Sequence, residues 1–132
     1  MATLIDASVL IAAERGTLDL KRLLSTHDDE ILLSSVTASE LLHGVHRASK
    51  PEIRKRRQRL VEELLDTFTV VPFDLEIART HARVWAEMAS RGITVGSHDL
   101  LIGATALALT ASVATRDLRS FPKIPGLKVL HW

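Results

Sequence analysis

Four acidic residues occur where carboxylates from separate segments of one chain can be brought together. Asp6 directly follows the short apolar run from Thr3 to Ile5, and Asp117 follows a second apolar run by three residues. Glu40 and Asp99 each lie near the beginning of a segment whose apolar residues have helical spacing. Carboxylate oxygens are ligands that Mg²⁺ and Mn²⁺ prefer, and such a cation offsets the repulsion between clustered acids. Because a cation held there would polarise a phosphoryl group, the pattern points to metal-dependent hydrolysis of phosphodiester bonds.

Each acid by itself also has a purely structural explanation. Asp6 is placed to cap the helix that follows it, and Asp99 to complement a helix dipole. Thr37 and Glu40 have the spacing of a capping box, and Asp117 suits a turn. For each residue alone, both interpretations stay open. Capping does not explain why four mutually repelling charges would gather at one edge, and this coincidence favours a functional site.

Short apolar segments alternate along the chain with longer segments of helical periodicity. We predict buried strands at residues 3–5, 31–33, 68–71 and 112–114, with a fifth at 128–131. These strands show no alternation of polar and apolar residues, which indicates a parallel sheet covered by helices on both faces. The expected fold is therefore α/β, a small parallel sheet of four to five strands between helices. In such a sheet the strand ends and the following helix starts share one edge, where the four acids would converge.

The composition narrows the class of protein. The 132 residues include 46% hydrophobic and 25% charged side chains, which suits one globular domain spanning residues 1–132. The absence of cysteine excludes thiol catalysis, zinc ribbons, iron–sulfur clusters and disulfide scaffolds, and it fits a reducing compartment. The beginning of the chain has no signal-peptide pattern, and its most apolar stretch, Leu100 to Leu109, is shorter than the about 20 residues that span a bilayer. We expect a cytoplasmic protein without a membrane segment.

The net charge of +1 hides an uneven distribution of charges. Between Arg47 and Arg59 there are seven basic residues and one acid, Glu52, which gives +6 and leaves −5 for the rest of the chain. One interpretation is the solvated face of an amphipathic helix over residues 51–66, and the other is a track for RNA phosphates. The candidate RNA-binding residues are Arg54, Lys55, Arg56, Arg57 and Arg59.

Other residue types offer weaker candidates. Phe68 and Trp85 occupy positions expected to be buried, so we expect no base-stacking platform of the kind that RNA-binding sheets use. His43 and His46 are spaced to share a helix face, but no adjacent Glu or third His completes a zinc motif. The chain has neither a Gly-rich phosphate loop nor a Gly-x-Ser-x-Gly elbow. The acids therefore carry the strongest chemical signal.

The segments that carry the acids share their order and spacing with a known family. They are Leu4-Ile5-Asp6-Ala7-Ser8-Val9-Leu10, Ser35-Val36-Thr37-Ala38-Ser39-Glu40-Leu41, His98-Asp99-Leu100-Leu101-Ile102-Gly103-Ala104, and Ala114-Thr115-Arg116-Asp117 followed by Phe121 and Ile124-Pro125-Gly126-Leu127. Together they resemble the PIN domain and, more closely, the VapC-type toxin ribonucleases of bacterial toxin–antitoxin modules. The resemblance covers essentially the whole chain.

This resemblance implies an endoribonuclease that depends on Mg²⁺ or Mn²⁺ and cuts single-stranded or looped RNA. The residues that match the family's acidic positions are Asp6, Glu40, Asp99 and Asp117. It further implies that Asp6, Asp99 and Asp117 hold the metal that activates a water, with Glu40 as a further ligand or as the base. Ser8 and Thr115 match the usual hydroxyl positions near the metal.

Two positions depart from the family's pattern. Many relatives have Thr after the first Asp, where this chain has Ala7. Some carry a further acid just before the aromatic residue, where this chain has Ser120 before Phe121. The second departure bears on whether a second metal ion is held, and it leaves the four main acids in place.

The resemblance also implies partners. A VapB-type antitoxin would wrap the toxin and block its acidic pocket, and toxins of this kind pair into homodimers and larger toxin–antitoxin hetero-oligomers. Two other functions compete with this one. A non-catalytic nucleic-acid-binding module built on the basic helix at 51–66 would not need the acids. A phospho-receiver domain would need paired acids after the first strand and a lysine near the last strand, whereas here Ala7 follows Asp6 and Lys123 lies in a Pro-rich turn.

Overall fold

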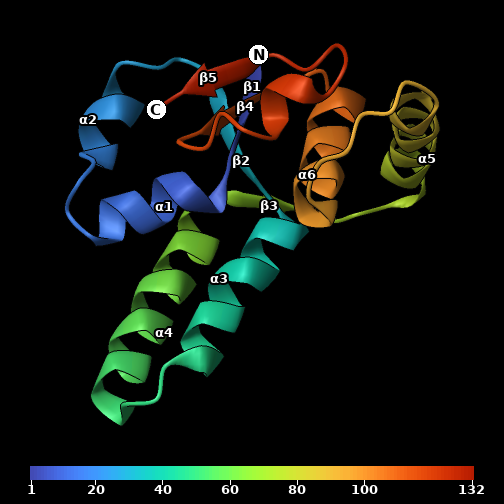
Figure 1. Ribbon diagram of the computed structural model, residues 1–132. Helices are drawn as coiled ribbons and strands as arrows, with labels where there is room; N and C mark the ends of the chain where they lie inside the picture. The colour runs from blue at the N-terminus through green and yellow to red at the C-terminus, as the bar shows by residue number, and fades with distance from the viewer.

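Strands and helices alternate along the chain in the computed structural model, which describes residues 1–132 (Figure 1). The strands are β1 (Ala2–Ile5), β2 (Glu30–Ser34), β3 (Thr69–Val71), β4 (Ser112–Thr115) and β5 (Val129–His131). The helices are α1 (Ala7–Glu14), α2 (Leu20–Ser25), α3 (Ser35–Arg47), α4 (Pro51–Thr67), α5 (Leu75–Ser90) and α6 (Ser97–Ala108), with a 3₁₀ turn η1 (Phe121–Lys123).

The five strands form one sheet in the order β3-β2-β1-β4-β5, and every pairing is parallel. This confirms the predicted α/β fold and the fifth strand. The chain builds the sheet outward from β1 in one direction and then returns to add β4 and β5 on the other side. The strand order therefore reverses beside β1, and ligands of open parallel sheets bind at such a reversal, beyond the carboxyl ends of the strands.

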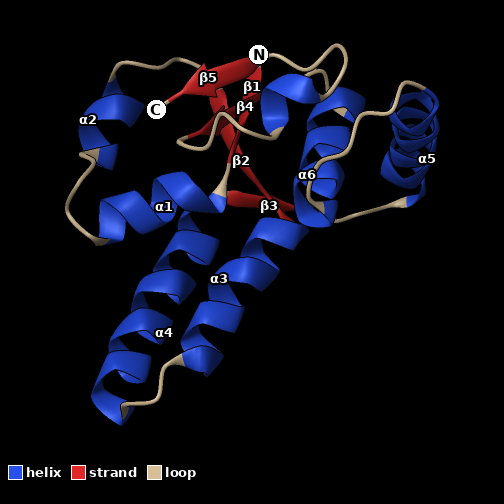
Figure 2. Cartoon of the chain, viewed as in Figure 1, coloured by secondary structure: helices blue, strands red, loops and turns tan.

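Neighbouring residues of the central strands serve two hydrophobic cores, one on each face of the sheet. Leu4 packs in a cluster that includes Val84 and Met88 of α5, together with buried residues of α6. Ile5 packs in the other cluster, with residues of α1 and α3 and with Val61 of α4. Figure 2 shows the strands between these groups of helices. Burial on both faces is the reason that the strands lack polar alternation.

Helices α3 and α4 form an antiparallel hairpin that extends away from the sheet (Figure 1). Val45 of α3 and Val61 of α4 are buried, and both belong to the cluster that contains Ile5. Pro51 occupies the first turn of α4, where the missing N–H costs nothing. The basic run between Arg47 and Arg59 therefore lies along the outer part of this hairpin, on more than one element.

One prediction about aromatic residues is wrong. Trp85 has 60% of its surface exposed, although the sequence pattern placed it in the core. Helix α5 directs Ile77, Val84 and Met88 inward, and one residue further along a helix lies about 100° further round it. Trp85 is consequently turned to the surface, whereas Phe68 is partly buried against the core as predicted.

Helix α6 is the most deeply buried helix of the fold, with six buried residues. A Cβ atom at Gly103 would lie 2.6 Å from Cδ1 of the buried Ile124. Glycine therefore lets α6 approach the η1 region closely. Although α6 is apolar, no helix in the protein combines the length and hydropathy of a membrane-crossing segment.

Candidate active site

Asp6 stands at the carboxyl end of the central strand with only 6% of its surface exposed. Its backbone N–H donates to the Ala114 carbonyl oxygen at 2.9 Å, which ties the end of β1 to β4. Its Oδ2 accepts hydrogen bonds from Ser8 Oγ at 2.7 Å and from Thr115 Oγ1 at 2.9 Å. Although Asp6 has the N-cap position of α1, its side chain makes no capping hydrogen bond. The two predicted hydroxyls thus meet at Asp6, and capping does not explain this acid.

Glu40 lies in α3 with its side chain half-buried. The capping box with Thr37 does not form, because Ser34 is the N-cap and its hydroxyl accepts from the Val36 N–H at 3.1 Å. Thr37 Oγ1 and Glu40 Oε1 are buried and have no hydrogen-bond partner. Burial, and after it the negative charge of Asp6, raises the pKa of Glu40. A buried acceptor without a donor is costly, so Glu40 Oε1 is an atom that a group from outside the chain would stabilise.

Asp99 lies in the first turn of α6, as predicted. Burial raises the pKa of Asp99, a side-chain hydrogen bond from Ser120 opposes this rise, and the charges of Asp6 and Asp117 add to it. The neighbouring His98 is exposed, and its charge lowers the pKa of Asp99. Complementing a helix dipole requires neither a half-buried carboxylate nor two other acids close to it. The dipole alone therefore does not explain the position of Asp99.

Asp117 lies in the turn after β4 and is held by an arginine that follows it. Its Oδ1 accepts from the backbone N–H of Arg119 at 2.9 Å and from Nε at 3.0 Å, and its Oδ2 accepts from Nη2 at 3.0 Å. These bonds hold the pKa of Asp117 below its ordinary value. The Asp117 N–H donates to Thr115 Oγ1 at 2.9 Å, so the turn is connected to the hydroxyls around Asp6. Asp117 is therefore a turn residue and a neighbour of the other acids at once.

The four acids meet at the predicted edge of the sheet. Asp6 raises the pKa values of Glu40 and Asp99, and Asp117 also raises the pKa of Asp99; the charge of His98 opposes this repulsion, yet both pKa values stay raised. As the side chains stand, no three His, Asp or Glu residues form a ready-made metal-binding cluster. An all-oxygen set with an unpaired buried acceptor fits Mg²⁺ or Mn²⁺, which complete their coordination with water and substrate phosphate.

The basic residues of α4 do not act as one face. Arg54 donates from Nε and Nη2 to the Ala48 carbonyl oxygen at 3.2 and 2.8 Å. It therefore provides a hydrogen-bond partner for a backbone carbonyl at the C-terminal end of α3. Arg57 donates to the Gly44 carbonyl oxygen at 3.4 Å and lies 3.7 Å from Glu14 Oε1. Two of the five candidates thus bind the protein itself. The candidates whose side chains are exposed and unpaired are Lys55, Arg56 and Arg59.

The sequence analysis missed two residues that contact the acids. Arg119 follows Asp117 by two residues, a spacing at which an Asp side chain can bond the backbone, so a local signal for this contact existed. Ser120 appeared only as a departure from the family's pattern, yet its hydroxyl bonds Asp99. No local signal could indicate that contact, because the two residues come from different segments.

Comparisons with known proteins agree with this fold. The family model for the PIN domain matches residues 3–127. The chain is 35% identical to Ribonuclease VapC1 of Rickettsia felis over 98% of this chain and 96% of that protein. It is 32% identical to the tRNA(fMet)-specific endonuclease VapC of Salmonella typhimurium over 76% of this chain and 74% of that protein. A structure of VapBC-5 from Mycobacterium tuberculosis, a member of the VapBC family of toxin–antitoxin systems, superposes with a TM-score of 0.81 and 30% identity over 99% and 98% of the two chains.

The parallel α/β fold, the family model and the curated relatives together define a small nuclease domain. The chain belongs to the PIN-domain family and, within it, to the VapC-type ribonucleases. The resemblance drawn from the four acidic segments is thereby confirmed, and the phospho-receiver alternative is wrong.

Proposed function

We propose that this protein is a divalent-metal-dependent endoribonuclease and the toxin of a VapBC-type toxin–antitoxin pair. The observation that carries the metal dependence is the convergence of Asp6, Glu40, Asp99 and Asp117, with the buried Oε1 of Glu40 unpaired. The curated relatives named ribonucleases support RNA as the substrate class. The proposal includes a cytoplasmic location, with which a cysteine-free sequence is consistent.

The roles of the residues follow from their contacts. Asp6, Asp99 and Asp117 would hold Mg²⁺ or Mn²⁺, which supplies the Lewis acidity that phosphodiester hydrolysis near neutral pH requires. Ser8 and Thr115 fix the orientation of Asp6 by donating to its Oδ2. These hydroxyls keep Asp6 from rotating away when the substrate binds, so the geometry is set before the reaction begins.

Glu40 acts as the general base in this proposal. Its raised pKa brings it nearer to the operating pH than an ordinary carboxylate, and its unpaired Oε1 has no competing donor from the protein. The Glu40 carboxylate accepts the proton of the attacking water, the oxygen of that water forms the new bond to phosphorus, the bond between phosphorus and the ribose oxygen breaks, and the departing ribose oxygen takes a proton from solvent. Asp117 must release Arg119, or share it with the substrate, before it binds a cation with both oxygens.

The partners follow from the family. A structure of a member of the VapBC family resembles this chain over nearly its whole length, which supports an antitoxin partner of the VapB type. We also expect a homodimer and a toxin–antitoxin hetero-oligomer. The non-catalytic alternative, a binding module on the basic helix, gives the four acids no role, and no observation favours it.

The proposal is tested by incubating the purified protein with a mixed cellular RNA pool in Mg²⁺ or Mn²⁺. We expect discrete fragments that disappear with EDTA and with Asp99→Asn. The matched control is Asp66→Asn, which removes an exposed acid on α4 outside the site and should cleave as the wild type does. Fragments that persist in EDTA, or an Asp99→Asn variant that cleaves normally, would contradict the proposal.

A further inference from the structure

A groove lined mostly by polar residues opens between α1, α3 and α4. Figure 1 shows how these three helices are arranged, with α1 near the end of the hairpin that adjoins the sheet. The groove has a volume of about 460 Å³. Its arginines come from three different elements, since Arg15 follows α1, Arg47 ends α3, and Arg56 and Arg57 lie on α4. The groove therefore has a composition that no single amphipathic helix provides. We call it the arginine groove.

Three of the four guanidinium groups in the arginine groove are free. Arg57 is held by Glu14 and by the Gly44 carbonyl oxygen. Arg15, Arg47 and Arg56 are exposed and make no salt bridge and no hydrogen bond to the protein, although Glu14 lines the same groove. Three cations without counter-charges in one concave surface attract an anion that carries several charges.

The arginine groove ends at the acidic site. Glu40 lines it, and Glu40 is the residue whose Oε1 is buried without a partner and whose pKa the charges of Asp6 and Asp99 raise. A chain of phosphates that lies along the arginines would therefore reach the carboxylates at one end of the groove. The carboxylates repel a phosphate except where the proposed Mg²⁺ or Mn²⁺ would offset their charge. Cleavage is therefore favoured at the one phosphate that lies beside this cation.

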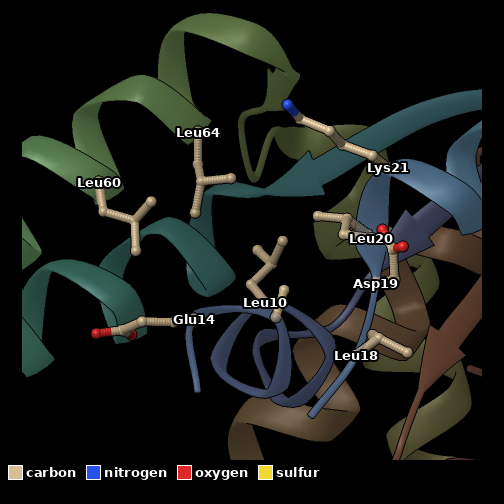
Figure 3. Close-up of a pocket in the computed structure, with 9 residues that line it drawn as sticks. Leu10, Glu14, Leu18, Asp19, Leu20, Lys21, Leu60 and Leu64 are labelled. Carbon is tan, nitrogen blue, oxygen red and sulfur yellow. The ribbon is translucent and has the colours of Figure 1, made fainter. Parts of the chain in front are cut away.

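The neighbouring hollow between α1, α2 and α4 has the opposite character. Its volume is about 330 Å³ and leucines dominate its lining, among them Leu10, Leu60 and Leu64 (Figure 3). It contains no arginine. Figure 3 shows the Glu14 carboxylate directed away from these leucines, on the side where the arginine groove begins. A phosphate backbone therefore has one suitable groove on this side of the protein.

We propose that the arginine groove binds the sugar–phosphate backbone of single-stranded RNA through Arg15, Arg47 and Arg56 and leads it to Glu40. This rests on the proposed function. Guanidinium groups bind phosphate oxygens in pairs, which suits them better than lysine to hold a backbone at a fixed position. The proposal narrows the RNA contact of α4 to the side that faces α1 and α3. Lys55 and Arg59, on the same helix, do not line the groove.

The test measures binding of a fluorescein-labelled single-stranded oligouridylate to the full-length Asp99→Asn protein in Mg²⁺ by fluorescence anisotropy over a series of salt concentrations. Added singly to this background, Arg15→Ala, Arg47→Ala and Arg56→Ala should each weaken binding about tenfold at low salt and reduce the salt slope by about 0.7. Arg59→Ala should have a smaller effect, and Arg83→Ala, an exposed arginine on α5, should have none. Thermal melts confirm that each variant is folded.

Three results would overturn the proposal. If Arg59→Ala and Arg83→Ala weaken RNA binding as much as Arg56→Ala does, the effect is that of overall charge. If the groove variants bind RNA normally but lose the antitoxin, the groove accommodates a protein segment. If the groove variants behave as the background protein while the wild type cleaves RNA, the proposed function stands and the groove assignment fails. A wild type that neither binds nor cleaves RNA defeats both.

Discussion

The acidic site and the arginine groove adjoin at Glu40 and are built in different ways. The acids are placed by the sheet, because each lies just after a parallel strand or within the first two turns of a helix that starts at the same edge. The arginines are placed by packing between three helices that differ in direction. The acids are partly or largely buried and repel one another, whereas the free arginines are exposed. The comparison indicates that chemistry here depends on fixed geometry, and RNA binding on charge distribution.

The two regions also differ in their effect on the stability of the folded protein. Burial and mutual repulsion raise the pKa values of Glu40 and Asp99, so their ionised forms destabilise the fold at neutral pH. Exposed arginines impose little such cost, because water screens them. A site that reduces stability in the absence of its ligand is typical of a functional site. The following variants are chosen to separate geometry from charge.

The largest expected effect comes from Thr115→Val, which removes a buried donor to Asp6 and leaves the shape of the side chain nearly unchanged. We expect cleavage to fall about tenfold or more and the free energy of unfolding to fall by about 1–3 kcal/mol. The matched control is Thr105→Val, which removes another buried hydroxyl that bonds the Leu101 carbonyl oxygen within α6 and none of the acids. It should reduce stability with little effect on cleavage. Equal losses of activity in both variants would mean that Thr115 matters only for folding.

A smaller effect is expected on stability when Glu40 is neutralised. Because its pKa is raised in the folded protein, the ionised carboxylate destabilises the fold above that pKa, and this cost disappears as the pH falls through it. Glu40→Gln should therefore raise the melting temperature in EDTA at pH 7–8 by about 2–4 °C, since the carboxyl is half-buried. The gain over the wild type should shrink on acidification. A melting temperature that falls at pH 7, or a difference independent of pH, would contradict this account of the site.

The smallest effect is expected from Arg119→Ala. Arg119 occupies both oxygens of Asp117, and its side chain is 90% exposed, so the pair contributes little to stability. Its removal frees Asp117 and should tighten Mn²⁺ binding by a few-fold, as measured by isothermal titration calorimetry. Arg91→Ala, which breaks the exposed pair with Glu87 on α5, serves as the control. Weaker Mn²⁺ binding after Arg119→Ala would show that the arginine helps to assemble the site.

The sequence was sufficient to predict the acidic site because the relevant signals are local. An apolar run that stops at Asp6 indicates a strand end, and parallel strands share that edge. The N-cap of α3 was misplaced because several hydroxyl residues precede Glu40, and only the structure shows that Ser34, not Thr37, is the cap. Trp85 was misplaced by one position around its helix.

The arginine groove could not be predicted from the sequence. The pattern showed that basic residues are concentrated between Arg47 and Arg59. It gave no information on which of their side chains form hydrogen bonds or ion pairs within the protein. Arg54 and Arg57 bond backbone carbonyl oxygens of α3 and the residue after it, and these contacts depend on how α4 packs. Arg15 lies outside the basic run altogether and joins the groove only through the position of α1.

The most direct test of the division between the two regions is single-turnover cleavage of one RNA by Asp99→Asn and Arg56→Ala at increasing protein concentration. The account predicts that Arg56→Ala reaches the wild-type cleavage rate when the RNA is saturated, at about tenfold higher protein concentration. It predicts that Asp99→Asn binds the RNA and does not cleave it at any concentration. A saturated Arg56→Ala variant that stays as slow as Asp99→Asn would place the arginine in the chemical step, and an active Asp99→Asn variant would remove the acidic site from it.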